Sequence, residues 1–362
     1  MDRVYNYSAG PSCLPLEVLE EAKNELLNYK NKGYSILEMN HRTKDYDEIN
    51  DDAINMLKKL LNVKNDYEVI FMQGGAYSQF SIFPMNLARK DDLTLYTLTG
   101  NFSEKAYIEG KKITNAKIIT SSKNSNYSFI SEITKELIDQ NAKFLHITVN
   151  NTAYGTCYNQ LPETGDVPLI GDMSSIILSK NYDINKFGLI YGGAQKNLGT
   201  AGITFVVIKK NLVNDKISEY IPSIFSYATQ IEKKSIFNTP PVFAVYILDL
   251  MLHWIEKQGG VMSLEKMSIE KSNMLYDLID NSNFYTGTAL KKDRSPVNIT
   301  FKTPNEDLDL KFIKEAKDYG LINLKGYKSC GGLRASLYNA MTIDGVKKLV
   351  EFMKKFEKEN EV

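Results

Sequence analysis

Residues 187–208 read FGLIYGGAQKNLGTAGITFVVI, two apolar runs around a glycine-rich turn that holds a single lysine, Lys196. Each run has the length and composition of a buried β-strand. A lysine between two such strands is shielded from bulk water, which lowers its pKa and suits a lysine that forms a Schiff base. An ordinary surface lysine in a hairpin turn is the alternative, and this stretch alone leaves both interpretations open.

Short apolar runs also alternate with helical patterns on either side of this stretch. Such alternation is typical of a mainly parallel sheet covered by helices on both faces, so we expect an α/β fold. The expected strands are 68–72, 93–99, 116–120, 143–149, 167–172, 187–192 and 202–208, and the helical patterns between them include 16–30, 46–62 and 131–141.

The sequence pattern changes after Pro240-Pro241, where two long helical runs replace the alternation of short strands and helices. A strand at 296–302, a helix at 308–320 and a final helix at 344–359 follow. A length of 362 residues is also more than one small core needs. We therefore expect a large domain at 16–258 and a smaller α+β domain formed by 1–15 together with 259–362.

Charge and composition exclude several classes of partner. Lys plus Arg and Asp plus Glu both number 44, so the zero net charge gives no reason to expect a nucleic acid or an anionic membrane. No run approaches the roughly 20 apolar residues of a membrane span, and the first residues lack the apolar core of a signal peptide. The three cysteines and three histidines are too scattered for a disulfide framework or a metal site. We expect a cytoplasmic protein without a metal.

Two further features could carry chemistry. Asp172 ends the apolar run 167–172, and acids at the carboxyl ends of such strands can pair with a protonated ring nitrogen. It could equally cap the chain that follows. Gly74-Gly75 follows the strand at 68–72 and opens a helix, where free backbone N–H groups suit a phosphate. This pair alone is more often a tight turn, and it is not the dinucleotide-binding pattern.

A phosphate loop, a strand-end aspartate and a glycine-flanked lysine, in that order, describe a pyridoxal-phosphate site. In its motifs the chain resembles the phosphoserine aminotransferases, in the class V branch of the fold-type-I pyridoxal-phosphate enzymes. The resemblance runs from residue 8 to residue 340. The segments that carry it are SAGP (8–11), His41-Arg42, GGA (74–76), NNT (150–152), DMSS (172–175), GAQKN (193–197), FNTPP (237–241) and GGLRASLYNA (331–340).

The resemblance implies pyridoxal 5′-phosphate as the cofactor. Lys196 would hold it covalently and shuttle a proton, while Asp172 would pair with its ring nitrogen. Thr152 would bond the phenolic oxygen, and Phe102 would stack on the ring where the family usually has tryptophan. The cofactor phosphate would lie against Gly75, Ala76, Tyr77 and Gln195, with Asn238 and Thr239 arriving from the second subunit of a homodimer whose active sites lie at the interface.

The resemblance also implies the substrates: O-phospho-L-serine and 2-oxoglutarate, giving 3-phosphooxypyruvate and L-glutamate in serine biosynthesis. A phosphothreonine analogue used in pyridoxine synthesis is a further candidate substrate. Arg334 would bind the substrate α-carboxylate as a planar fork. His41 and Arg42 of the partner subunit would bind the phosphate or distal carboxylate, with Ser8 and Lys328 completing the substrate site.

Three positions depart from the family pattern. The family usually has His-Arg before the glycines of the arginine motif, where this chain has Tyr327-Lys328. Some members also have arginine at the position of Tyr77. Lys328 keeps a charge without the fork, and Tyr327 cannot become cationic. We therefore expect weaker discrimination for phosphate, by about 1–3 kcal/mol.

Three alternatives stay open. The first is a class V aminotransferase whose substrate is a different anionic amino acid. A class V lyase such as a cysteine desulfurase would use a thiol near Cys330, although desulfurases have histidine where this chain has Gln195. A dimeric scaffold without activity would not need an acid–base lysine. The joint presence of Lys196, Asp172, Thr152 and Arg334 favours an enzyme.

Overall fold

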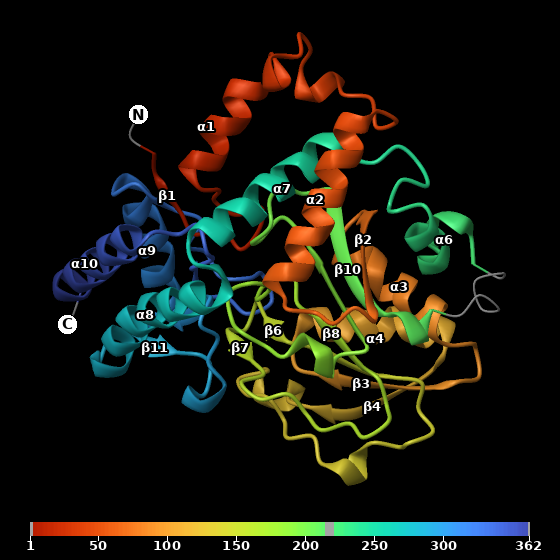
Figure 1. The fold of residues 1–362 in the computed structure, drawn as a ribbon. Helices are drawn as coiled ribbons and strands as arrows, with labels where there is room; N and C mark the ends of the chain where they lie inside the picture. The colour runs from red at the N-terminus through yellow and green to blue at the C-terminus, as the bar shows by residue number, and fades with distance from the viewer. Residues whose placement is uncertain (1–2, 214–220, 361–362) are drawn as a thin grey trace.

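A seven-stranded sheet forms the centre of the protein in the computed structural model, which describes residues 3–213 and 221–360 (Figure 1). The strand order is β2-β10-β9-β8-β5-β3-β4. β10 runs antiparallel to both of its neighbours and every other pair is parallel, so the other six strands share one direction. This confirms the mainly parallel α/β sheet. The strands are β2 (Tyr67–Gln73), β3 (Leu93–Leu98), β4 (Asn115–Ser121), β5 (Leu145–Thr148), β8 (Leu169–Asp172), β9 (Leu189–Gly193) and β10 (Ile203–Lys209).

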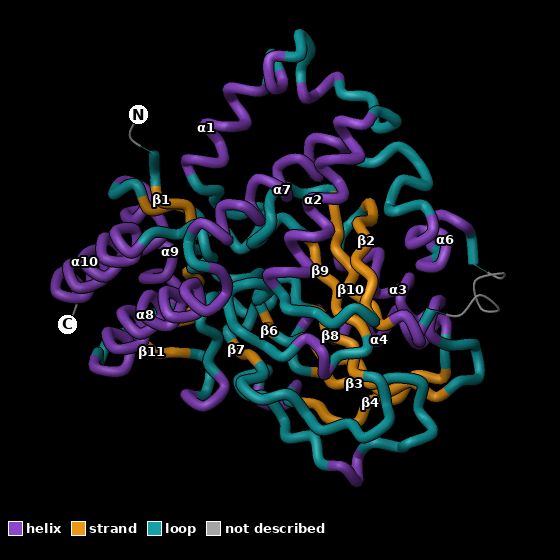
Figure 2. The backbone as a smooth tube through the Cα atoms, viewed as in Figure 1, coloured by secondary structure: helices purple, strands orange, loops and turns teal. Residues whose placement is uncertain are grey.

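Helices cover both faces of this sheet, as Figure 2 shows. In β2, Val69 and Phe71 belong to the core that α2 and α7 share, whereas Ile70 and Met72 belong to the core beneath α3. Both faces of the strand are therefore buried at residues 69–72, which explains why this run is unbroken and apolar. Among the described residues, no helix is long and apolar enough to cross a membrane. The helices of this part are α1 (Leu16–Glu25), α2 (Lys44–Leu60), α3 (Ala76–Leu87), α4 (Asn101–Ile113), α6 (Tyr227–Glu232) and α7 (Val242–Lys257).

A second core lies to one side of the sheet, where α8, α9 and α10 gather (Figure 1). These helices pack on a three-stranded sheet, β11-β12-β14. Tyr7 belongs to the same core, and β1 pairs with β13, so the first residues join the C-terminal part of the chain. The domain division at 258/259 stays a prediction. The elements are β1 (Tyr5–Asn6), α8 (Gly260–Asn281), β11 (Thr286–Gly287), β12 (Asn298–Lys302), α9 (Glu306–Asp318), β13 (Leu321–Ile322), β14 (Leu333–Ser336) and α10 (Ile343–Asn360). A small hairpin, β6 (Asn150–Asn151) and β7 (Thr156–Cys157), lies in the sequence between β5 and β8 of the central sheet.

The prediction of a helix at 131–141 is wrong. The structure has only a short 3₁₀ turn there, Lys135–Leu137. The side chain of Asp139 accepts a hydrogen bond from the backbone N–H of Asn141 at 3.0 Å, a local bond that competes with helix formation. Leu137 is also exposed, so the apolar residues of this segment do not form one buried face.

The first helix is shorter than predicted. We expected it over 16–30, but α1 ends at Glu25. The side chain of Asn28 accepts a hydrogen bond from the backbone N–H of Gly33 at 2.7 Å, and Tyr29 begins a separate 3₁₀ turn. These local bonds replace the helical ladder that the apolar spacing suggested.

Candidate active site

Five predicted site segments meet at one edge of the central sheet. β2, β3, β5, β8 and β9 run in the same direction, so their carboxyl ends lie along the same edge. The segments that follow these ends hold Gly75, Phe102, Thr152, Asp172 and Lys196. Ligands of open α/β sheets bind at this edge. Topology therefore gathers residues that are more than 100 positions apart in the sequence.

Lys196 points into this edge. Its Nζ donates a hydrogen bond to Thr152 Oγ1 at 2.7 Å and lies 5.3 Å from the centroid of the Phe102 ring. Burial lowers the pKa of Lys196 to about 8; the nearby Asp172 opposes this shift and Arg334 adds to it. The side chain is therefore the shielded lysine that the sequence suggested and not an outward-facing lysine of a surface hairpin.

The N-terminal segment packs against the loop that carries this lysine. Gly10 has a φ of +140°, and a Cβ at this position would lie 3.2 Å from Lys196 Cγ. The backbone N–H of Ser12 donates to the carbonyl of Gln195 at 3.0 Å, and the Ser12 hydroxyl contacts the carbonyl of Lys196. Ser8 accepts from the backbone N–H of Gly10 at 3.3 Å. Ser8 and Gln195 are thus both brought to the lysine loop.

Asp172 is buried at the end of β8. Its Oδ1 accepts from the backbone N–H of Ser174 at 2.9 Å and from the Ser174 hydroxyl at 2.6 Å. Burial raises the pKa of Asp172, while these bonds and the charge of Lys196 oppose the rise. Both bonds end on Oδ1, so Oδ2 is the oxygen left for a ligand nitrogen. The local capping role and the ligand role considered from the sequence are therefore compatible.

The start of α3 offers backbone donors. Gly74 has a φ of +103°, and a Cβ at Gly75 would meet no atom within 4 Å. The first α3 amide bonded to a carbonyl is that of Ser78, which bonds the carbonyl of Gly75 at 3.0 Å. The earlier amides, those of Ala76 and Tyr77, have no preceding helical carbonyl to bind. This open first turn suits a phosphate group.

Arg334 reaches the site from β14 of the second core. Its Nη1 donates to the backbone carbonyl of Thr152 at 3.4 Å. Its Nε is buried and has no hydrogen-bond partner in the described part of the chain. A carboxylate would satisfy that donor through the guanidinium fork. Tyr327 lies close by, with its ring centroid 6.3 Å from that of Phe102, whereas Lys328 is exposed.

The family model described as aminotransferase class-V matches residues 4–349. The chain belongs to the class V aminotransferase family. This confirms the resemblance inferred from the motifs. A phosphoserine aminotransferase of Bacillus cereus is 47% identical over 360 residues, 99% of this chain and 100% of the relative.

Solved structures place this class V aminotransferase beside the same group of relatives. A phosphoserine aminotransferase studied for radiation damage of its Schiff base superimposes with a TM-score of 0.96 at 45% identity, covering 99% of this chain and 100% of that one. The phosphoserine aminotransferase of Trichomonas vaginalis, with bound PLP, gives a TM-score of 0.91 at 33% identity, covering 97% and 100%.

Two predicted substrate residues of this class V aminotransferase do not join the site within one chain. His41 and Arg42 lie in the turn before α2, where the backbone N–H of Arg42 donates to Asn40 Oδ1 at 2.9 Å. Within residues 3–213 and 221–360, neither side chain bonds to the lysine site. Their contribution to a partner subunit stays a prediction.

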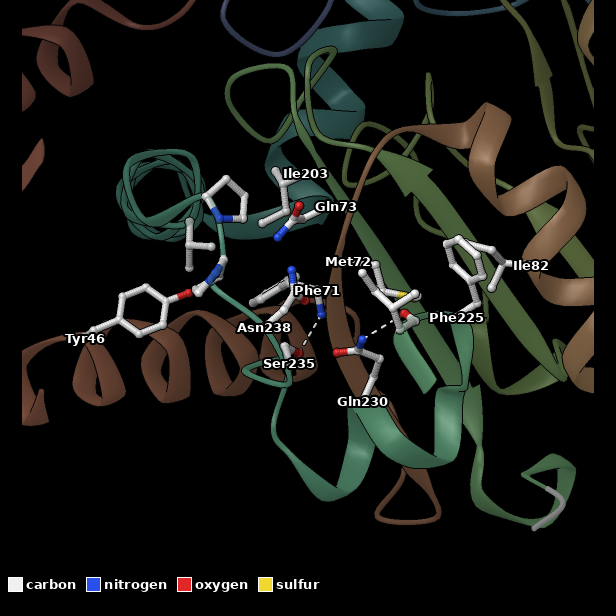
Figure 3. Close-up of a pocket in the computed structure, with 14 residues that line it drawn as sticks. Tyr46, Phe71, Met72, Gln73, Ile82, Ile203, Phe225, Gln230, Ser235 and Asn238 are labelled. Atoms are coloured by element: carbon white, nitrogen blue, oxygen red, sulfur yellow. Dashed lines mark hydrogen bonds between the residues drawn. The ribbon is translucent and has the colours of Figure 1, made fainter. Parts of the chain in front are cut away.

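Asn238 and Thr239 lie next to the end of β2. The side chain of Gln73 donates to the backbone carbonyl of Thr239 at 2.6 Å. Figure 3 shows Asn238 and Gln73 on the wall of a small cavity of about 60 Å³, where Ser235 accepts from the backbone N–H of Phe71 at 2.8 Å. The lysine does not line this cavity. The reach of Asn238 and Thr239 toward a second subunit also stays a prediction.

A larger cavity of about 770 Å³ opens between the start of α4 and the loop that carries Tyr327. Ser329 joins its walls, because the Asn101 amide donates to the Ser329 hydroxyl at 3.1 Å and the hydroxyl of Tyr154 lies 3.4 Å from it. Cys330 lines this cavity with its Sγ 3.7 Å from Ser329 Oγ. Lys196, Asp172 and Arg334 do not line this cavity.

Three metal-ligating side chains meet away from this site. Asp52, Asp249 and His253 have possible ligand atoms within 4.8 Å of one another. The sequence did not predict this cluster, because Asp52 comes from α2 and the other two residues come from α7. His253 Nε2 lies 2.8 Å from Asp52 Oδ2, as in an ordinary ion pair. Burial, with a smaller effect of Asp52, raises the pKa of Asp249 to about 7. The expected absence of a metal stays a prediction.

Sequence reasoning missed Lys105. This half-buried residue of α4 donates a hydrogen bond to the Tyr77 hydroxyl, and its Nζ lies 4.8 Å from the centroid of the Tyr77 ring. Helical spacing could have found it, because residues three apart share a face and Lys105 follows Phe102 by three positions. Because α4 contains other lysines, the sequence alone did not distinguish Lys105 from them.

Proposed function

We propose that the chain catalyses the reversible, pyridoxal-phosphate-dependent transfer of an amino group between O-phospho-L-serine and 2-oxoglutarate. The products are 3-phosphooxypyruvate and L-glutamate, and the reaction serves serine biosynthesis. The observation that carries this proposal is the convergence of Lys196, Asp172, Thr152 and Arg334 at one edge of the sheet.

The site residues fit pyridoxal phosphate. Lys196 offers a shielded amine, and Asp172 offers an unengaged carboxylate oxygen. The free amides at the start of α3, at Ala76 and Tyr77, offer a place for the phosphate. When bound, the cofactor supplies a ring that stabilises negative charge at the substrate Cα. The carboxylate of Asp172 keeps such a ring nitrogen protonated, and Phe102 covers the ring with an apolar face.

Lys196 is suited to move the substrate proton. Its pKa of about 8 lies near neutral pH, where a group can both accept and return a proton. The amine takes the proton from the substrate Cα, with Thr152 holding its position through the 2.7 Å hydrogen bond. Burial of this amine limits the exchange of the proton with solvent.

The substrate has an anion at each end. Arg334 binds the α-carboxylate, because its guanidinium contacts Thr152 and its buried Nε has no partner among residues 3–213 and 221–360. His41 and Arg42 of a second copy bind the phosphate, and Asn238 and Thr239 of that copy reach the cofactor phosphate. The active form is therefore a homodimer in the cytoplasm. The phosphate of 4-phosphohydroxy-L-threonine fits the same distal position.

A half-reaction tests the proposal. Purified protein loaded with pyridoxal phosphate is mixed with phosphoserine, aspartate or alanine, and the absorbance of the bound cofactor is followed in a stopped-flow instrument. We expect conversion to the pyridoxamine form with kcat/KM at least about 100-fold higher for phosphoserine than for alanine, the scale of two charged hydrogen bonds. Equal rates for the three amino acids would refute phosphoserine as the substrate.

A further inference from the structure

Lys105 occupies the rim of the site between three aromatic side chains. Its Nζ bonds the Tyr77 hydroxyl and lies 4.8 Å from the Tyr77 ring centroid and 5.7 Å from that of Phe102. The hydrogen bond to Tyr77, together with a weaker influence of Tyr327, raises the pKa of Lys105 and keeps it cationic. In the part of the chain that the structure describes, no carboxylate forms an ion pair with it.

Other lysines of the same region have carboxylate partners. Lys112 pairs with Glu109 at 2.7 Å, and Lys123 pairs with Glu104 at 2.6 Å. Glu104 directly precedes Lys105 in the sequence but is engaged by Lys123. The charge of Lys105 is therefore not neutralised within the site and remains available to an anionic ligand.

The distance between Lys105 and Lys196 has an upper limit that is set by the Phe102 ring between them. The two amines lie 5.3 and 5.7 Å from the centroid of the same Phe102 ring, so they are at most about 11 Å apart, the sum of those distances. Proton transfer places Cα about 3 Å from Lys196 Nζ. Three bonds add about 4 Å to the phosphorus, and a charged contact adds about 3 Å. The total reach of about 10 Å is comparable to the largest separation that the two amines can have.

We propose that Lys105 is a substrate-binding residue that grips the phosphate of the amino-acid substrate, with Tyr77 and Tyr327 presenting its amine. This inference rests on the proposed function. It explains how the chain holds a dianion although Tyr327-Lys328 and Tyr77 stand where related enzymes carry His-Arg and, in some members, arginine. Lys105 of α4 thus supplies the positive charge that related enzymes carry at those loop positions.

The test compares Lys105→Met with wild type and with Lys111→Met, an exposed lysine of the same helix. Methionine keeps a long apolar stem over the rings and removes the charge together with the hydrogen bond to Tyr77. Stopped-flow half-reactions with phosphoserine and with alanine give kcat/KM, and titration with pyridoxal phosphate gives its Kd. We expect Lys105→Met to lower kcat/KM for phosphoserine about 10- to 100-fold, mainly through KM, with alanine and the cofactor Kd unchanged within twofold.

Each outcome separates the proposals. Lys105→Arg should recover most of the phosphoserine activity, and Lys111→Met should match wild type. An equal fall in kcat/KM for phosphoserine and alanine, or a higher Kd for pyridoxal phosphate, would overturn the assignment of Lys105 to the substrate phosphate. No loss in Lys105→Met would overturn it too. If wild type itself showed no preference for phosphoserine over alanine, the proposed function would fail independently of any variant.

Discussion

The two ends of the active site are built differently. At the cofactor end, Asp172 and Thr152 are almost fully buried and are held by bonds within the sheet edge. At the rim, Tyr77 is 54% exposed and Lys328 is exposed. The buried end consists of residue types that the family motifs specify, whereas the rim is where the chain departs from them. The family motifs therefore lie where packing fixes the side chains, and the proposed substrate contacts lie where side chains can change at little cost to the fold.

This contrast predicts that Lys196→Ala has the largest effect. Loss of the amine removes both the covalent attachment and the proton carrier, so we expect kcat to fall at least about 10,000-fold. The melting temperature of the cofactor-free protein should hardly change, because the variant removes one buried ammonium and one hydrogen bond. Steady-state kinetics and thermal melting measure the two quantities. A variant that retained a tenth of the activity would show that the buried end does not carry the chemistry.

Asp172→Asn should have the next largest effect. An amide cannot hold a proton on the cofactor ring nitrogen, so kcat should fall about 100- to 1,000-fold, the cost of removing one oriented electrostatic contact. The bonds from Ser174 can still end on the amide oxygen, which preserves the local turn. Rates within threefold of wild type would contradict the pairing of Asp172 with the ring nitrogen.

The lowered pKa of Lys196 predicts how cofactor uptake depends on pH. Only the neutral amine attacks an aldehyde, so the rate of pyridoxal-phosphate uptake by cofactor-free protein should rise about tenfold per pH unit up to about pH 8 and then level off. An ordinary lysine would keep gaining rate to about pH 10.4. Absorbance after mixing follows the uptake. A rise that continued past pH 9 would show that the amine is not shielded.

Lys328→Arg should have the smallest effect, and it should increase the preference for phosphoserine over alanine. Arginine restores a planar fork for phosphate, so we expect kcat/KM for phosphoserine to rise up to about tenfold, with alanine unchanged. Half-reaction kinetics with both amino acids measure the change. If both substrates gained equally, the rim would be acting on the cofactor and not on phosphate.

Much of the fold and of the buried end could be predicted from the sequence. Strands buried on both faces give unbroken apolar runs, so their positions and the placement of Asp172 at the end of β8 followed directly. The glycine-rich turn around Lys196 was equally visible. Thr152 was identified only through resemblance, because a threonine after a strand carries no signal of its own.

The rest depended on contacts between distant segments. Lys105 looks like any helical lysine until Tyr77 is placed beside it by folding. The ladder of apolar residues at 131–141 suggested a helix, but the Asp139 side chain offered the backbone a competing local bond. His41 and Arg42 illustrate a third limit, since their predicted role requires a second subunit and a single chain does not contain that contact.

The N-terminal strand has a practical consequence for anyone who modifies this enzyme. Tyr5 and Asn6 are paired with β13, and the backbone N–H of Ser12 donates to the carbonyl of Gln195 beside Lys196. An affinity tag or fused fluorescent protein at this terminus would be attached to the segment that packs on the Lys196 loop. The final helix α10 ends away from the central sheet (Figure 1), so the opposite terminus is the safer handle for purification or immobilisation.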